Sequence, residues 1–177
     1  MDQHYARFNV VKKAVYIRQQ FERCLGVVVL VLMVSLAGIV VAGVIFRKAG
    51  ASLVWYDEVT SILLAWLTFY GASLAALTRS HIGFQKVVAA IKSVKVRFAL
   101  LLIRFVIVTA FFLLVAWAGW RLLEVLEGTA LISLPWVPLA LAQSAIPIGA
   151  LLFVVAEMIT TADLLRDLFS RHRVALR

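Results

Sequence analysis

The stretch Trp55–Phe84, WYDEVTSILLAWLTFYGASLAALTRSHIGF, combines a long apolar segment with charged residues at both ends. Asp57 and Glu58 stand in its first turn, and Arg79 and His81 stand near its end. The twenty residues between Glu58 and Arg79 carry no charge, and about this many residues are needed for a helix to cross a ~30 Å hydrocarbon core. The stretch therefore predicts a transmembrane helix with ionisable groups at both membrane surfaces.

The composition assigns the whole chain to the same class. Of its 177 residues, 64% are hydrophobic, and the mean hydropathy is +1.01, whereas soluble domains are about 45–50% apolar. The formal charge of +9 does not indicate nucleic-acid binding, because the basic residues stand at the ends of apolar runs. Cys24 is the only cysteine, so a disulfide framework is excluded. We predict an all-α integral membrane protein.

Charge-poor runs predict four transmembrane helices in a single membrane domain, residues 1–177. We place the spans at about residues 24–46, 57–78, 98–120 and 137–159. Pro135 and Pro138 mark the entry of the last span, because proline is well suited to the start of a helix and disrupts its interior. The first span is too long for a signal-peptide core and follows a charged leader, residues 1–23, so we expect it to remain as a helix.

The distribution of lysine and arginine predicts that both termini face the cytoplasm. The leader, the connection between the second and third spans and the tail, residues 160–177, hold fourteen of these side chains. The other two connections hold Arg47, Lys48 and Arg121. Lysine and arginine accumulate in cytoplasmic connections, and an even number of spans returns the chain to the side where it began.

Two segments outside the spans are predicted to be amphipathic helices at the inner membrane surface. In the leader, Phe8, Val11 and Val15 recur at helical spacing beside basic residues. The connection between the second and third spans repeats this design with Val87 and Ile91. Such helices suit an anionic inner leaflet. The alternative is that either helix packs on the other spans.

Polar residues within the spans are candidate functional residues, because they are costly in lipid. Arg104 lies near the cytoplasmic edge of the third span, where it can extend to the surface or form an ion pair. Glu157 lies near the inner end of the fourth span. Gln143 and Pro147 lie deeper, where an amide bonds between helices and a proline kinks its helix. We favour a structural role for all four residues.

Small residues recur along the second span at spacings of three or four. They are Ser61, Ala65, Thr68, Ala72 and Ala76. Small side chains let helices approach closely in a membrane, where lipid offers no hydrophobic driving force for association. The stripe packs either inside the chain's own bundle or against another membrane protein, and the sequence leaves both possibilities open.

The chain carries little that is suited to catalysis. Its histidines are His4, His81 and His172, none of which pairs with another within the membrane, so a bis-histidine haem is not expected. A metal-ligand cluster and a nucleophile elbow are also lacking from the sequence. We therefore predict that the chain is not an enzyme and binds no metal or cofactor.

Several residues of the second span form a recognisable pattern. They are Trp55, Glu58, Trp66, Gly71, Ala72, Arg79 and His81. This pattern closely resembles the signature of the small membrane subunit of tripartite ATP-independent periplasmic (TRAP) transporters, the DctQ-like family. The last span, Leu134–Phe153, is similar to the proline-bearing fourth helix of that family. One departure is Gln85, because members often carry an acid four residues after the histidine.

The resemblance implies a subunit without a transport site of its own. In that family a large permease holds the substrate and sodium sites, and a periplasmic binding protein delivers an organic acid. The small subunit packs on the permease as part of its static scaffold in the bacterial inner membrane. The expected partners are therefore these two proteins and membrane lipids, not nucleic acid. The alternatives are a self-sufficient homo-oligomeric transporter and a membrane-bound enzyme subunit.

The candidate site residues are accordingly those of a partner interface or a membrane anchor. They are Trp55, Asp57, Glu58, Ser61, Ala65, Trp66, Thr68, Gly71, Ala72, Ala76, Arg79 and His81. We expect the charged ends to fix the depth of the second span. We also expect Glu58 to pair with Arg47, with Arg121 or with a group on the permease.

Overall fold

The computed structural model describes residues 2–78 and 94–175, which are predominantly helical. The helices are α1 (Asp2–Lys48), α2 (Tyr56–Leu77), α4 (Val94–Val125), α5 (Leu139–Gln143) and α6 (Ala145–Ala175). Among the described residues, four helical segments qualify by length and composition as membrane spans, with α5 and α6 together forming the fourth. The prediction of four long apolar helices is thus confirmed.

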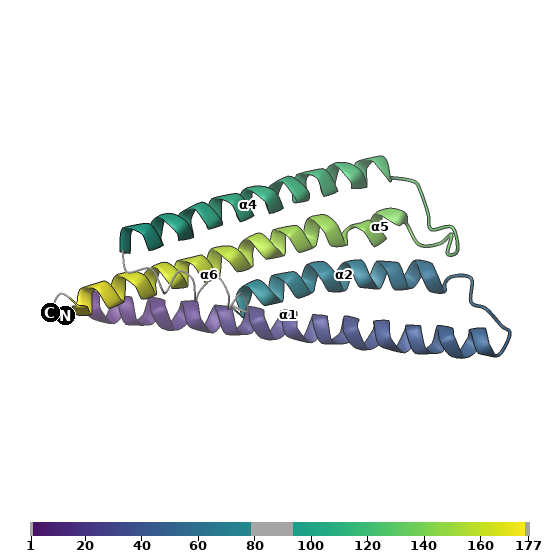
Figure 1. Cartoon of the computed structure of the whole chain (residues 1–177), viewed down its shortest axis with the longest axis horizontal. Coiled ribbons are helices and arrows are strands. Elements are labelled where there is room, and N and C mark those ends of the chain that lie inside the picture. The colour runs from purple at the N-terminus through teal and green to yellow at the C-terminus, as the bar shows by residue number, and fades with distance from the viewer. Residues whose placement is uncertain (1, 79–93, 176–177) are drawn as a thin grey trace.

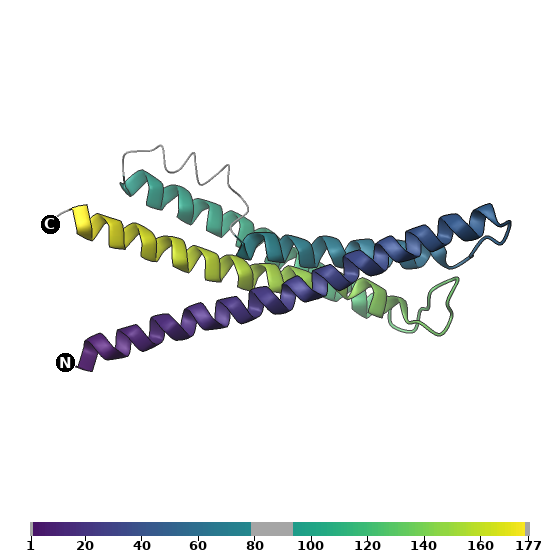
Figure 2. The same cartoon turned by 90° about the horizontal axis from the view of Figure 1, so that it is seen from below.

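The helices lie side by side in the order α1, α2, α6, α4 (Figure 1). Helix α6 packs against both α2 and α4, whereas α1 packs mainly against α2. Figure 2 shows that α1 crosses the other helices obliquely. In the most apolar window of each span, 44% of the residues of the fourth are buried, against 6% for α1 and for α4. The two edge helices therefore present most of their apolar side chains outward.

Both termini lie at one end of the molecule, and the loops formed by residues 49–55 and 126–138 lie at the other (Figure 1). Helix α1 has 47 residues, which corresponds to about 70 Å and exceeds the ~30 Å hydrocarbon core. The leader is continuous with the first span, because no glycine or proline interrupts residues 2–25. The second predicted amphipathic helix falls mainly on residues 79–93, outside the described residues.

The fourth span begins at Leu139 and breaks between Gln143 and Ala145. Pro147 causes this break, because its nitrogen has no hydrogen for the carbonyl of Gln143 and its ring crowds that carbonyl. The turn tightens at Ser144, whose N–H donates to the Leu141 carbonyl at 3.3 Å. The position of the break agrees with the kink expected from Pro147.

The core lies between α2 and α6. Its buried members include Ala76 and Leu77 of α2 and Phe153 and Ala156 of α6. Phe112 of α4 stacks on Phe153 with ring centroids 3.8 Å apart, which joins the third span to the same cluster. Because Ala76 and Ala156 are small, the α2 and α6 backbones can approach closely, whereas the stacked rings fill the space between α6 and α4.

Candidate functional site

Glu58, in the first turn of α2, is bonded to the loop between α4 and α5. Its carboxylate accepts hydrogen bonds from the backbone N–H of Ile132 at 3.1 Å and of Ser133 at 2.9 Å, and from the Ser133 hydroxyl. A carboxylate can accept all three because its two oxygens offer about four lone-pair sites. Glu58 therefore ties the start of α2 to a loop that follows the third span.

The two arginines expected as partners of Glu58 are engaged elsewhere. The guanidinium of Arg47 lies over the ring of Tyr56, 5.9 Å from its centroid. Arg121 pairs with Glu124 at 3.2 Å on the exposed surface of α4. The expected ion pair within the chain is thus replaced by hydrogen bonds from two backbone amides and the Ser133 hydroxyl, which no charge in the sequence indicates.

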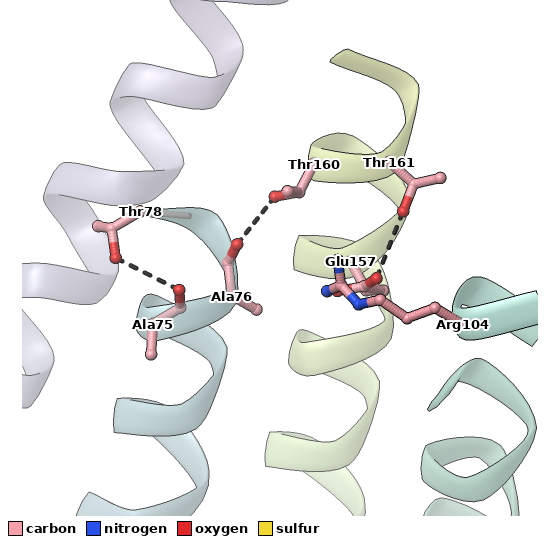
Figure 3. Close-up of polar contacts among 7 residues, drawn as sticks. All are labelled: Ala75, Ala76, Thr78, Arg104, Glu157, Thr160 and Thr161. Carbon is pink, nitrogen blue, oxygen red and sulfur yellow. Dashed lines mark hydrogen bonds and ion pairs between the residues drawn. The ribbon is translucent and has the colours of Figure 1, made fainter. Parts of the chain in front are cut away.

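The small-residue stripe of α2 divides into an inward and an outward part. Ala76 belongs to the inward part: it is 1% exposed, and its carbonyl accepts a hydrogen bond from the hydroxyl of Thr160 at 2.9 Å (Figure 3). Ala72 is partly buried against the same core cluster, and Ala65 is also partly buried. The inward part of the stripe therefore serves packing within the chain.

The outward part consists of Ser61, Thr68 and Gly71, which we call the outward stripe. Ser61 and Thr68 are exposed, and their hydroxyls donate to the carbonyls one turn earlier, at 2.8 Å and 2.7 Å. A methyl group added to Gly71 would meet no atom within 4 Å. Asp57, which is exposed, lies one turn before Ser61 on this side. This side of α2 is open to a neighbouring molecule, and the 53% exposed side chain of Leu64 lies on it between Ser61 and Thr68.

Trp66 and Trp55, the two tryptophans of the family-like pattern, both make hydrogen bonds within this chain. The indole N–H of Trp66 donates to the carbonyl of Ala142 in α5 at 3.2 Å, and its ring stacks on that of Tyr70 with centroids 5.4 Å apart. Trp55 immediately precedes α2, and its carbonyl accepts the N–H of Val59 at 3.1 Å. Trp66 therefore joins the second span to the start of the fourth.

Arg104 and Glu157 form an ion pair between α4 and α6. The guanidinium nitrogen Nη2 of Arg104 lies 3.0 Å from Oε2 of Glu157, and the hydroxyl of Thr161 donates to Oε1 at 3.3 Å (Figure 3). The Glu157 side chain is only 1% exposed, and that of Arg104 is 18% exposed. The sequence left open whether Arg104 extends to the membrane surface or forms an ion pair, and in the structure it forms the ion pair.

Arg18 links three helices near the end that carries the termini. Its guanidinium pairs with Asp163 of α6 at 2.8 Å and donates to the carbonyl of Leu77, the last residue of α2, also at 2.8 Å. A cation is favourable at a helix C-terminus, where the final carbonyls lack helical donors. This cluster was not predicted from the sequence, although both charges lie just outside the apolar runs of their helices.

Arg79 and His81 lie outside the described residues, so the structure does not place them. Within residues 2–78 and 94–175, no group of three or more His, Cys, Asp and Glu side chains is arranged to hold a metal ion. The polar side chains described above act between helices: they connect α1 with α6, α2 with α5 and α6, and α4 with α6.

Comparison with known protein families gives a match over most of the chain. Residues 36–167 match the family model described as "Tripartite ATP-independent periplasmic transporters, DctQ component". The chain belongs to the DctQ family. The matched range includes α2, α4, α5, most of α6 and the C-terminal part of α1, so it covers the Glu58 and Arg104 contacts. A search of curated proteins gave no match.

The resemblance based on the second span is thereby confirmed. This DctQ component is a multi-pass membrane protein of a TRAP system and belongs to a family of transporter components, not of enzymes. The tripartite family implies a partner permease and a periplasmic binding protein. The α2, α4 and α6 contacts are therefore those of the small membrane component of such a system.

Proposed function

We propose that this DctQ component is a non-catalytic scaffold subunit of a sodium-coupled TRAP transporter. It packs on the large permease and supports uptake of an organic acid that the periplasmic binding protein delivers. In this account the substrate and sodium sites belong to the permease. The candidate residues of α2, with Arg79 and His81, serve as a partner interface and as anchors at the membrane surfaces.

The observation that carries this proposal is the use of polar groups within the spans. The Arg104–Glu157 pair joins α4 to α6, and the hydroxyl of Thr160 bonds to α2. The buried hydroxyl of Ser73 in α2 lies 3.2 Å from the carbonyl of Gly149 in α6. Groups committed to helix–helix bonds rigidify a membrane protein. A rigid layer with two open edges, α1 and α4, suits a scaffold for a larger partner.

The orientation belongs to the same proposal: we place the termini in the cytoplasm and Glu58 at the periplasmic surface. The excess of lysine and arginine in the leader, in residues 79–97 and in the tail supports this direction. The location of both termini at one end of the molecule is compatible with it (Figure 1). The basic leader then lies on the inner side, within reach of anionic lipids.

The orientation can be tested by cysteine labelling. In a Cys24→Ala background we expect Val54→Cys, in the exposed loop before α2, to react with an impermeant thiol reagent added to intact cells. We expect Ser80→Cys, between Arg79 and His81, to react only after the inner membrane is opened. Labelling of both positions from outside, or of Ser80→Cys alone, would overturn the orientation.

The outward stripe is the proposed contact of α2 with the permease. We expect the pair Ser61→Leu and Thr68→Leu to reduce copurification of the permease severalfold while the chain itself stays folded, because leucine keeps backbones apart. Ala76→Leu is the matched variant on the inward side, and overpacking there should cost the chain about 1–3 kcal/mol of its own stability. Wild-type copurification with the Ser61 and Thr68 pair would assign the outward stripe to lipid.

Glu58 is the residue that most resembles a coupling site, and its amide variant tests the proposal. We expect Glu58→Gln to retain substantial sodium-driven uptake per assembled complex, with unchanged sodium stoichiometry, because the amide oxygen still accepts a bond from the loop. Asp57→Asn, which changes the exposed neighbouring carboxylate, is the control. Uptake near zero by a fully assembled Glu58→Gln complex would make Glu58 part of the transport mechanism.

A further inference from the structure

The loop between α4 and α5, residues 126–138, has an ordered backbone. Gly128, with φ of 83°, is the third residue of a turn in which the N–H of Thr129 donates to the carbonyl of Leu126 at 3.1 Å. The N–H of Leu131 donates to the carbonyl of Val137 at 3.0 Å, and the N–H of Leu139 donates to that of Thr129 at 3.0 Å. These bonds close residues 129–139 into a short hairpin, in which Ala130 and Pro138 form an antiparallel bridge.

The tip of this hairpin is fixed from two sides. The N–H of Val137 donates to the carbonyl of Leu134 at 2.9 Å, which closes a tight turn with Pro135 at its second position. On the other side, the backbone amides of Ile132 and Ser133 donate to the carboxylate of Glu58. Because both amides and the turn are bonded within the protein, this part of the loop needs little water to satisfy its backbone.

The ordered loop displays two large apolar side chains. Ile132 is 95% exposed and Trp136 is 77% exposed. By contrast, the preceding Leu131 is buried, and the backbone amides of Ile132 and Ser133 are bonded to Glu58. Residues 128–138 contain no charged side chain. Exposed isoleucine and tryptophan on a bonded, uncharged loop are unfavourable in water and indicate a surface that another phase or molecule covers.

The membrane is the occupant that the neighbouring surface favours. The loop continues directly from the last turns of α4, where Trp120 is 61% exposed and Val125 is 78% exposed. These side chains belong to a membrane span, and the exposed Arg121–Glu124 pair lies among them. A mixture of apolar and charged side chains is found where a span meets the headgroups, and the loop continues from that end. Tryptophan is enriched where a span meets the headgroups, because its ring is apolar and its N–H is polar.

We propose that the α4–α5 loop is a membrane-surface anchor that inserts Ile132 and Trp136 among the lipid headgroups, with Glu58 as the residue that holds it in position. The inserted surface is uncharged, so it takes zwitterionic as well as anionic lipid. This anchor sets the depth of the α4 and α5 ends, and hence of the outer half of the fourth span. The inference concerns the membrane surface alone and is independent of the transport role.

Spin-label depth measurements test this anchor. In a Cys24→Ala background, Ile132→Cys and Trp136→Cys are labelled separately with a nitroxide. The full chain is reconstituted in phosphatidylethanolamine–phosphatidylglycerol vesicles, with and without its permease. Collision with oxygen is then compared with collision with a polar nickel chelate present on both sides of the vesicles. Glu127→Cys, on the charged edge of the same loop, is the aqueous control.

The expected result is that labels at Ile132 and Trp136 collide several-fold more with oxygen, relative to the chelate, than the label at Glu127. Adding Glu58→Ala is expected to increase the mobility of the Ile132 label and to lower its oxygen preference. Equal chelate access at all three positions would overturn the anchor. So would labels that are aqueous in vesicles of the chain alone and become shielded only when the permease is added. An unchanged Ile132 label in Glu58→Ala would remove the role given to Glu58.

Discussion

Replacing Arg104 by leucine is expected to lower the free energy of unfolding by about 3–5 kcal/mol, the range found when one member of a buried ion pair is removed. The variant leaves the carboxylate of Glu157, 1% exposed, beside the Thr161 hydroxyl without its charged partner in α4. Unfolding of the purified chain in mild detergent, followed by circular dichroism against denaturant, measures this loss.

Two further variants separate the ion pair from side-chain packing. The double variant Arg104→Leu with Glu157→Leu removes both charges, and we expect it to recover most of the lost stability, since apolar replacements of a buried pair are often neutral or better. Arg104→Lys keeps the charge but not the planar guanidinium, and its stability should lie between wild type and Arg104→Leu. A single Arg104→Leu variant as stable as wild type would show that the pair does not join α4 to α6.

Gly149→Ala is the second substitution for which we expect a large effect. A β-carbon at Gly149 would lie 2.4 Å from Cβ of Phe69 in α2, closer than carbon atoms approach, and 3.1 Å from its Cγ, a tight contact. Cβ of Phe69 is fixed to the backbone, so it cannot move away unless α2 shifts. The hydrogen bond from Ser73 to the Gly149 carbonyl, 3.2 Å, would lengthen as well. We expect a loss of about 1–3 kcal/mol or more, as for other overpacked cores.

The matched control for Gly149 is Gly71, which lies in α2 two residues from Phe69. An added β-carbon at Gly71 meets no atom within 4 Å, so Gly71→Ala should be neutral or should stabilise the helix by up to about 1 kcal/mol. Detergent unfolding of the two alanine variants in parallel gives the comparison. Equal stability of both variants would mean that α2 and α6 are not in close contact at Gly149.

The spans could be predicted from the sequence because membrane crossing depends on length and charge alone. Of the twenty uncharged residues after Glu58, all but Thr78, which directly follows α2, lie within that helix, and Pro138 marks the start of the fourth span as expected. The lateral order of the helices could not be predicted. An apolar side chain in a span is equally suited to lipid and to a neighbouring helix, so the pattern of α1 or α4 does not identify its neighbour.

For Arg104 and Glu58, the sequence predicted that the side chains would make polar contacts, but not which residues they would contact. Arg104 was expected to form an ion pair or to extend to the surface, but nothing in the sequence selects Glu157 over other acids. The contacts of Glu58 were less predictable still, because its partners are two backbone amides and a serine hydroxyl of a loop. Backbone donors are present at nearly every residue, so only the three-dimensional path of the 126–138 loop identifies them.

The most direct test of the scaffold account is sodium-driven uptake in proteoliposomes of defined content. The DctQ component alone, the permease with the binding protein, and all three together are compared, each with and without a sodium gradient. The account predicts no uptake by this chain alone. It predicts full uptake by the complete set, with a fixed number of sodium ions per transported solute. Solute uptake by the purified chain alone would contradict it and favour a self-sufficient homo-oligomeric transporter.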